Sequence, residues 1–168
     1  TVSRVYIPDQ LWEKGWKQIE QLQSEGKKCY LRLPRISRGE WKRKLEKIFP
    51  KADGVLFANL EQLQYLRECG MDMIRVADSS LYVWNREAER FLSTYADEIT
   101  LPLELNQYEK RELGEGCFEE VLYGRTALMH TANCIRKTCG TCGNGRNGEE
   151  EFWNLTDRYH KIFPVQFD

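Results

Sequence analysis

The sequence predicts an α/β protein whose repeated βα units form a partial TIM-like barrel with about six parallel strands. Short apolar runs begin near residues 3, 28, 54, 73, 98 and 119. Amphipathic stretches lie between them, so each unit of about 19 to 26 residues is long enough for one strand and one helix. At 168 residues the chain can bury one substantial core, which favours a single domain.

Each element follows from a local pattern. The expected strands are, in order, Val2 to Ile7, Cys29 to Leu33, Val55 to Ala58, Met73 to Ala77, Ile99 to Leu105 and Glu120 to Tyr123. Asp9, Asn59 and Asn85 are placed to cap helices, because their side chains can accept hydrogen bonds from the first turn. Further helical stripes are expected around 41–49 and 108–113. Pro102 indicates a strand end within the fifth run, and the alternation around Cys29 predicts that this thiol lies in the core.

The loops that follow the predicted strands carry many polar side chains. They include Arg35, Asn59, Asp78, Glu104, Asn106, Gly124 and Arg125. Parallel strands joined by right-handed crossovers place all their carboxyl ends on one side, and in barrels that side carries the chemistry. We therefore expect a site on this rim.

Three cysteines follow the sixth predicted strand in a glycine-rich loop. Cys134, Cys139 and Cys142 have the spacing C-x4-C-x2-C, which opens one iron–sulfur motif, and its C-x2-C half also suits zinc. Candidates for a fourth ligand are Cys29, Cys69, Cys117, His130 or a residue beyond Asp168. We expect metal binding by these three thiols, and the alternative is a set of reduced thiols in a loop.

Composition limits the classes of partner and the cellular compartment that we expect for the chain. The formal net charge of −1 gives no general basic field for nucleic acid, and no apolar run approaches the ~18 residues of a membrane span. Six cysteines without a secretory signal predict a reducing, cytoplasmic compartment.

The chain begins at Thr1 without Met, so we expect it to be part of a longer protein. Residues 1–126 would form the βα-repeat region, and residues 127–168 the Cys/Gly-rich loop and carboxyl-terminal segment of the same domain. Six units fall short of a closed barrel of eight. Exposed strand edges then predict self-association, or pairing with the rest of the parent chain.

Several motifs resemble the carboxyl-terminal part of the collagenase-like peptidase family U32. They are Leu101-Pro102-Leu103-Glu104-Leu105-Asn106, Glu120-Val121-Leu122-Tyr123-Gly124-Arg125, Ala127-Leu128-Met129 leading to Cys134, and Leu155-Thr156-Asp157-Arg158 with Phe163-Pro164-Val165. The resemblance implies a βα barrel, a protease label, and a site lined by Glu104, Asn106 and Arg125. Ala127 stands where the family frequently has a cysteine, and Cys139 is an additional one.

Some members of that family are similar instead to iron–sulfur proteins that hydroxylate RNA bases or a quinone ring. By that likeness Cys134 and Cys142 would be ligands of a 4Fe–4S cluster in the full-length protein. The sequence thus leaves open a peptidase acting on peptides, a hydroxylation enzyme acting on RNA or a quinone, and a non-catalytic binding module. For hydrolysis, Cys134 with His160, or zinc on Cys139, Cys142 and His130 with Glu104 as base, are the pairings that the residue types allow.

Overall fold

The computed structural model describes residues 2–37, 41–138 and 152–166. The chain divides into two compact units, Thr1–Ala127 and Leu128–Asp168. No helix in the described ranges is both long enough and apolar enough to cross a membrane.

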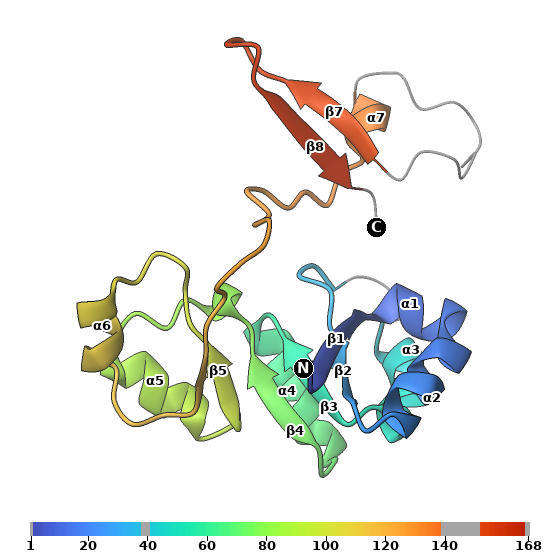
Figure 1. The fold of residues 1–168 in the computed structure, drawn as a ribbon, viewed down its shortest axis with the longest axis vertical. Helices are drawn as coiled ribbons and strands as arrows, with labels where there is room; N and C mark the ends of the chain where they lie inside the picture. The colour runs from blue at the N-terminus through green and yellow to red at the C-terminus, as the bar shows by residue number, and fades with distance from the viewer. Residues whose placement is uncertain (1, 38–40, 139–151, 167–168) are drawn as a thin grey trace. The chain divides into compact units, whose positions relative to one another are not determined.

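The first unit is a curled, all-parallel sheet of six strands in the order β1-β2-β3-β4-β5-β6 (Figure 1). The strands are β1 (Arg4–Pro8), β2 (Lys28–Arg32), β3 (Gly54–Phe57), β4 (Ile74–Ala77), β5 (Glu98–Thr100) and β6 (Phe118–Glu119). Helices alternate with the strands, so the predicted fold class, a partial α/β barrel, is confirmed.

Five of the connections between strands contain helices. These are α1 (Asp9–Lys14) and α2 (Trp16–Ser24), α3 (Trp41–Ile48), α4 (Leu60–Cys69), α5 (Arg86–Ser93) and α6 (Gln107–Glu112), with 3₁₀ turns η1 (Phe49–Lys51) and η2 (Ser79–Leu81). The predicted caps at Asn59 and Asn85 are confirmed, because their side chains accept from the backbone N–H groups of Gln62 and Ala88, each at 2.9 Å. Both helices therefore begin where the sequence indicates.

The predicted cap at Asp9 is wrong. Asp9 lies in the first turn of α1, Pro8 occupies the cap position, and no side chain caps this helix. The helical segment that follows is divided at Gly15 into α1 and α2, and the N–H of Gly15 donates to the carbonyl of Leu11 at 2.8 Å. Proline is favoured at a helix start, where its missing N–H costs nothing.

The last two predicted strands need correction as well. β5 ends at Thr100, and β6 is Phe118–Glu119 rather than Glu120 to Tyr123. The N–H of Leu101 still donates to the carbonyl of Glu119 at 2.9 Å, but the next residue, Pro102, has no N–H to donate toward β4 on the other side. Beyond this point the chain leaves the sheet, and the Tyr123 side chain is fully exposed.

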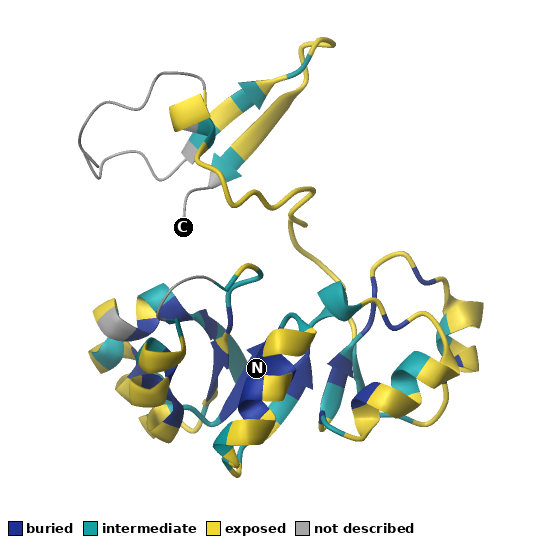
Figure 2. Ribbon diagram, turned by 180° about the vertical axis from the view of Figure 1, so that it is seen from behind, coloured by how far each residue is buried: buried dark blue, intermediate teal, exposed yellow. Residues whose placement is uncertain are grey.

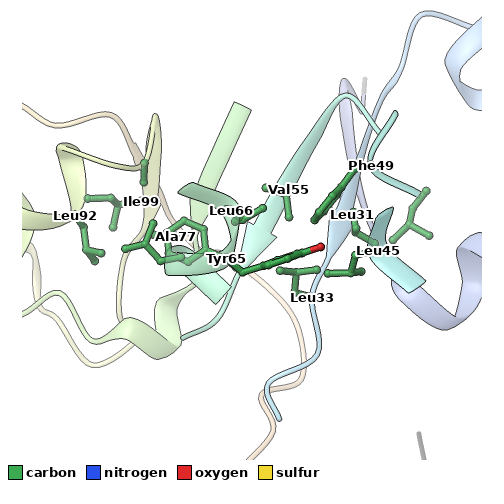
Figure 3. Close-up of a cluster of buried hydrophobic side chains, with 14 of the residues drawn as sticks. Leu31, Leu33, Leu45, Phe49, Val55, Tyr65, Leu66, Ala77, Leu92 and Ile99 are labelled. Atoms are coloured by element: carbon green, nitrogen blue, oxygen red, sulfur yellow. The ribbon is translucent and has the colours of Figure 1, made fainter. Parts of the chain in front are cut away.

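The helices cover one face of the sheet and form the main core with it. Buried strand residues meet buried helix residues there, as Figure 3 shows for Leu31, Leu33, Leu45, Phe49, Val55, Tyr65, Leu66, Ala77, Leu92 and Ile99. Cys29 is fully buried in this core, as predicted. Figure 2 shows the same arrangement from behind, with exposed residues on the outer sides of the helices.

The second unit contains α7 (Ile135–Thr138) and an antiparallel hairpin of β7 (Phe152–Thr156) and β8 (Ile162–Gln166). Asp157 organises the hairpin turn. Its carboxylate accepts from the N–H groups of Tyr159 at 2.8 Å and Lys161 at 2.9 Å, and its own N–H donates to the carbonyl of Lys161 at 3.0 Å. His160 has a φ of 58° in this turn, a conformation uncommon for residues other than glycine.

Candidate functional site

The face of the sheet opposite the helices is lined by alternate residues of the strands. Because successive side chains point to opposite faces, the residues that flank the buried core positions all turn to this side. The curl of the sheet makes it the inner, concave face. It contains a charged network at the amino ends of the strands, an apolar band in the middle and a polar rim at the carboxyl ends.

Arg4 is the centre of the charged network. Its guanidinium donates to both carboxylate oxygens of Glu98, each at 2.6 Å, and to Glu119 at 2.5 Å. Tyr6 donates to the same carboxylate of Glu119 at 2.6 Å. These bonds join β1, at one edge of the sheet, to β5 and β6 at the other. Side chains therefore close the inner face where no backbone pairing does.

The network changes the titration of its members. Hydrogen bonding to Glu98 raises the pKa of Arg4, and hydrogen bonding to Arg4 lowers the pKa of Glu98. Burial raises the pKa of Tyr6, and its bond to Glu119 adds to the shift. The guanidinium also lies over the ring of Tyr30, 4.5 Å from its centroid. At neutral pH Arg4 is thus a cation, Glu98 a carboxylate and Tyr6 a neutral phenol.

The middle of the inner face is packed. Tyr30, Leu56 and Val76 are buried there in a second, smaller cluster, with Tyr6 packed against it. Small barrels are filled by side chains in the same way. A ligand would therefore meet this face at its carboxyl rim.

The rim brings together three of the residues that the sequence places after strands. Arg35 lies 3.6 Å from the carboxylate of Asp78, and the side-chain amide of Asn59 donates to the carbonyl of Arg35 at 3.3 Å. Asp78 also accepts from the N–H of Ser80 at 2.8 Å. The loops after β2, β3 and β4 are thus linked side by side.

Gln62 connects the loops after β2 and β3 through side-chain hydrogen bonds. Its side chain is fully buried, it accepts from the N–H of Ala58 at 2.7 Å, and it donates to the carbonyl of Pro34 at 2.7 Å and to Ser37 at 2.8 Å. A buried amide with all its bonds made fixes the two loops relative to each other.

The sequence-predicted residues Glu104, Asn106 and Arg125 lie in the loop after β5, at the cap of α6 and in the segment after β6. Within the described residues no hydrogen bond or ion pair joins the three. Asn106 has a structural task, because its side chain accepts from the N–H groups of Tyr108 and Glu109 in a capping box. Glu104 and Arg125 are exposed. Their catalytic roles stay predictions.

A small hollow lies next to the loop that carries Glu104. Its volume is about 30 Å³, and it is lined by Leu101, Pro102, Leu103, Lys110, Glu120 and Val121. This space suits water rather than a substrate.

Only one of the three cysteines predicted to bind metal lies among the residues that the structure describes. Cys134 is an exposed, free thiol just before α7, whereas Cys139 and Cys142 lie outside the described residues. Among residues that the structure does describe, no three His, Cys, Asp or Glu side chains form a group able to hold a metal ion. Cys134 supplies one thiol and a four-thiolate cluster needs three more ligands, so Cys134 alone cannot hold such a cluster. Since Cys134 belongs to the second unit, its proximity to Glu104 and Arg125 also stays a prediction.

Searches against protein-family models, curated proteins and solved structures gave no match to this chain. The fold and the residues of the inner face therefore carry the functional argument.

Proposed function

We propose that the chain is part of a barrel enzyme of the U32 type, that it hydrolyses peptides, and that its substrate binds at the carboxyl rim of the curled sheet. The proposed reaction, peptide hydrolysis, rests on the sequence resemblance. The observation that carries the location is the meeting of Arg35, Asn59 and Asp78 from three successive loops, because barrel enzymes place their reacting groups at this end.

Peptide hydrolysis needs a base that activates water and a positive group near the oxyanion. Asp78 and Arg35 supply such groups side by side. Asp78 is held by the N–H of Ser80, which leaves its carboxylate in a fixed position. Glu104, in the loop after β5, is the other candidate base.

Cleavage of a fluorogenic peptide library by the purified chain tests this proposal. We expect Asp78→Asn or Glu104→Gln to lower the rate by about 100-fold or more, and Glu20→Gln, on the outer surface of α2, to leave it unchanged. Unchanged rates in both rim variants would remove these carboxylates from the mechanism. No cleavage by the wild-type chain or by the longer protein would favour a binding module.

Iron–sulfur hydroxylation of an RNA base or a quinone is the second candidate, and the observation in its favour is the exposed free thiol of Cys134. Its ligands would be Cys134, Cys139 and Cys142 with one cysteine from the longer protein, and zinc is the alternative metal. We expect the full-length protein, purified without oxygen, to be brown and to lose iron on Cys134→Ser. A colourless, iron-free protein would rule this candidate out.

We also propose a cellular compartment for the protein and its association with another chain. Cys29, Cys69, Cys117 and Cys134 are all free, which supports a reducing, cytoplasmic location. In the described sheet β1 pairs only with β2, and β6 only with β5. Each edge can accept another strand, from a second copy or from the rest of the parent chain. Light scattering should show a mass above that of the monomer, and a monodisperse monomer would contradict self-association.

A further inference from the structure

We infer that Arg32 binds a carboxylate of the ligand at the carboxyl rim, so that the preferred ligand is a peptide with a free carboxyl group. This inference rests on the proposed substrate site and adds the chemical group recognised there.

Arg32 is the last residue of β2, and its direction follows from its neighbours. Leu31 and Leu33 are both buried in the core on the helix side, so Arg32 turns to the inner face. There it lies in register between Pro8 of β1 and Leu56 of β3. The guanidinium is thus presented at the carboxyl end of the inner face, and Arg32 is exposed.

The charge of Arg32 has no partner within the described residues. The carboxylate that follows the neighbouring strand, Asp9, is paired with Lys44 of α3 at 3.1 Å. Glu98, which continues the same row of the inner face through Val76, is bound by Arg4. Each of these two acids therefore already has a cation, and within the described residues the donors of Arg32 are available to a ligand.

Arg35 adds a second cation on the loop that follows. Its separation of 3.6 Å from Asp78 is an ion pair without a hydrogen bond. Asp78 therefore does not use the N–H donors of this guanidinium, although the ion pair restricts where the guanidinium lies. Arg35 thus adds positive charge to the loop after β2, while Arg32 can bind a carboxylate through the paired N–H bonds that arginine forms with this group.

The charge of the rim favours a carboxylate on a peptide over the phosphates of RNA. The chain carries a net charge of −1, and Asp78 lies directly at the rim, where it would repel a second anionic group. Polyanion binding needs a continuous basic surface. A single carboxylate needs only the guanidinium of Arg32.

NMR titration of the arginine Nε–H signals in the intact chain tests the inference. The ligands are acetyl-trialanine with a free carboxyl group, the same peptide with an amidated end, and a short single-stranded RNA. We expect the free acid to bind at least about tenfold more tightly than the amide, because bonds to a charged group are lost. Arg32→Gln should remove this preference. Arg90→Gln, on the exposed surface of α5, is the matched control and should keep it.

The outcomes separate the inference from the proposed function. Equal binding of acid and amide, or an acid preference that survives in Arg32→Gln, would overturn the carboxylate site and leave the peptide site standing. Binding of neither peptide would overturn both. Binding of RNA alone, lost in Arg32→Gln, would reject the carboxylate in favour of phosphate. Thermal unfolding of each variant checks that the exposed substitution leaves the fold intact.

Discussion

Replacing Arg4 by methionine should open the inner face of the sheet. Methionine keeps an unbranched apolar stem that can pack on Tyr30, and the substitution removes the cation that bonds to both Glu98 and Glu119 and leaves Tyr6 as the β1 side chain bonded to Glu119. In Arg4→Met these two carboxylates face each other without a cation. The expected result is a lower free energy of unfolding of the first unit at pH 7.

The magnitude follows from the burial of the network. Removing one partner of a fully buried ion pair costs about 3–5 kcal/mol, and an exposed pair is worth about 0–1 kcal/mol. The side chain of Arg4 is 25% exposed, and those of Glu98 and Glu119 are 18% and 26% exposed. Because these values lie closer to the buried limit, we expect a loss of about 2–4 kcal/mol.

The pH dependence provides an independent check. The folded state lowers the pKa of Glu98, so its contribution is present above the unfolded pKa, near about 4.3, and is lost as the pH falls through the folded pKa. In Arg4→Met the cation that lowers the pKa of Glu98 is absent, and the two carboxylates repel each other. Protonation then relieves the repulsion, so the difference between wild type and variant should shrink as the pH falls from 7 to 4.

Urea unfolding, followed by the fluorescence of the tryptophans and by circular dichroism, measures these differences. Trp12 is buried in the first unit and reports on it directly. Lys28→Met is the matched control, because its pair with Asp53 has a side chain 65% exposed and should be worth about 0–1 kcal/mol. Adding Glu98→Gln and Glu119→Gln to Arg4→Met should restore part of the loss. A loss no larger than that of the control, or one independent of pH, would refute the role of the network.

Three further predictions concern the first unit. Gln62→Leu should lower the free energy of unfolding by about 2–3 kcal/mol, because the N–H of Ala58 then has no acceptor; a thermal shift within error of wild type would contradict this. Gly54→Ala should cost about 1–3 kcal/mol, since a Cβ there would lie 2.8 Å from the carbonyl oxygen of Ile74; a stable variant with wild-type urea midpoint would argue against this contact. Burial tends to raise the pKa of Asp53, but the N–H of Cys29 and other donors lower it overall. Its stabilising effect should therefore be present above the unfolded pKa of about 3.9 and disappear as the pH falls through the folded pKa, and Asp53→Asn should flatten this part of the stability profile.

The fold and the rim were accessible from sequence for a physical reason. Strand and helix alternate with regular spacing, and parallel connection alone fixes which loops share an edge. This is why Arg35, Asn59 and Asp78 could be placed together before any coordinates. The ends of β5 and β6 could not be predicted in the same way. They depend on how far the two strands stay paired after Leu101, and the local sequence does not specify this.

The charged network was missed, although one local signal was present. A strand buried on both faces is a continuous apolar run, whereas Arg4-Val5-Tyr6-Ile7 and Glu98-Ile99-Thr100 alternate polar and apolar residues. That alternation indicates a polar inner face. It does not indicate the partners, because Arg4 and Glu98 are 94 residues apart and meet only once the sheet has curled.

The position of this network makes the two ends of the inner face different. Arg4 and Glu98 are the first residues of their strands, so their bonds close the amino end of the face, and Tyr30, Leu56 and Val76 fill its middle. Arg32 stands at the other end of β2 with its charge unpaired among the described residues. A ligand that approaches the inner face therefore meets a packed interior and, at the carboxyl end, the positive charge of Arg32. The curl of the sheet therefore underlies both the closure of the amino end by Arg4 and the proposed anion binding at Arg32. Arg4→Met, which should open the curl, should also weaken ligand binding at the rim, although Arg4 does not touch the ligand.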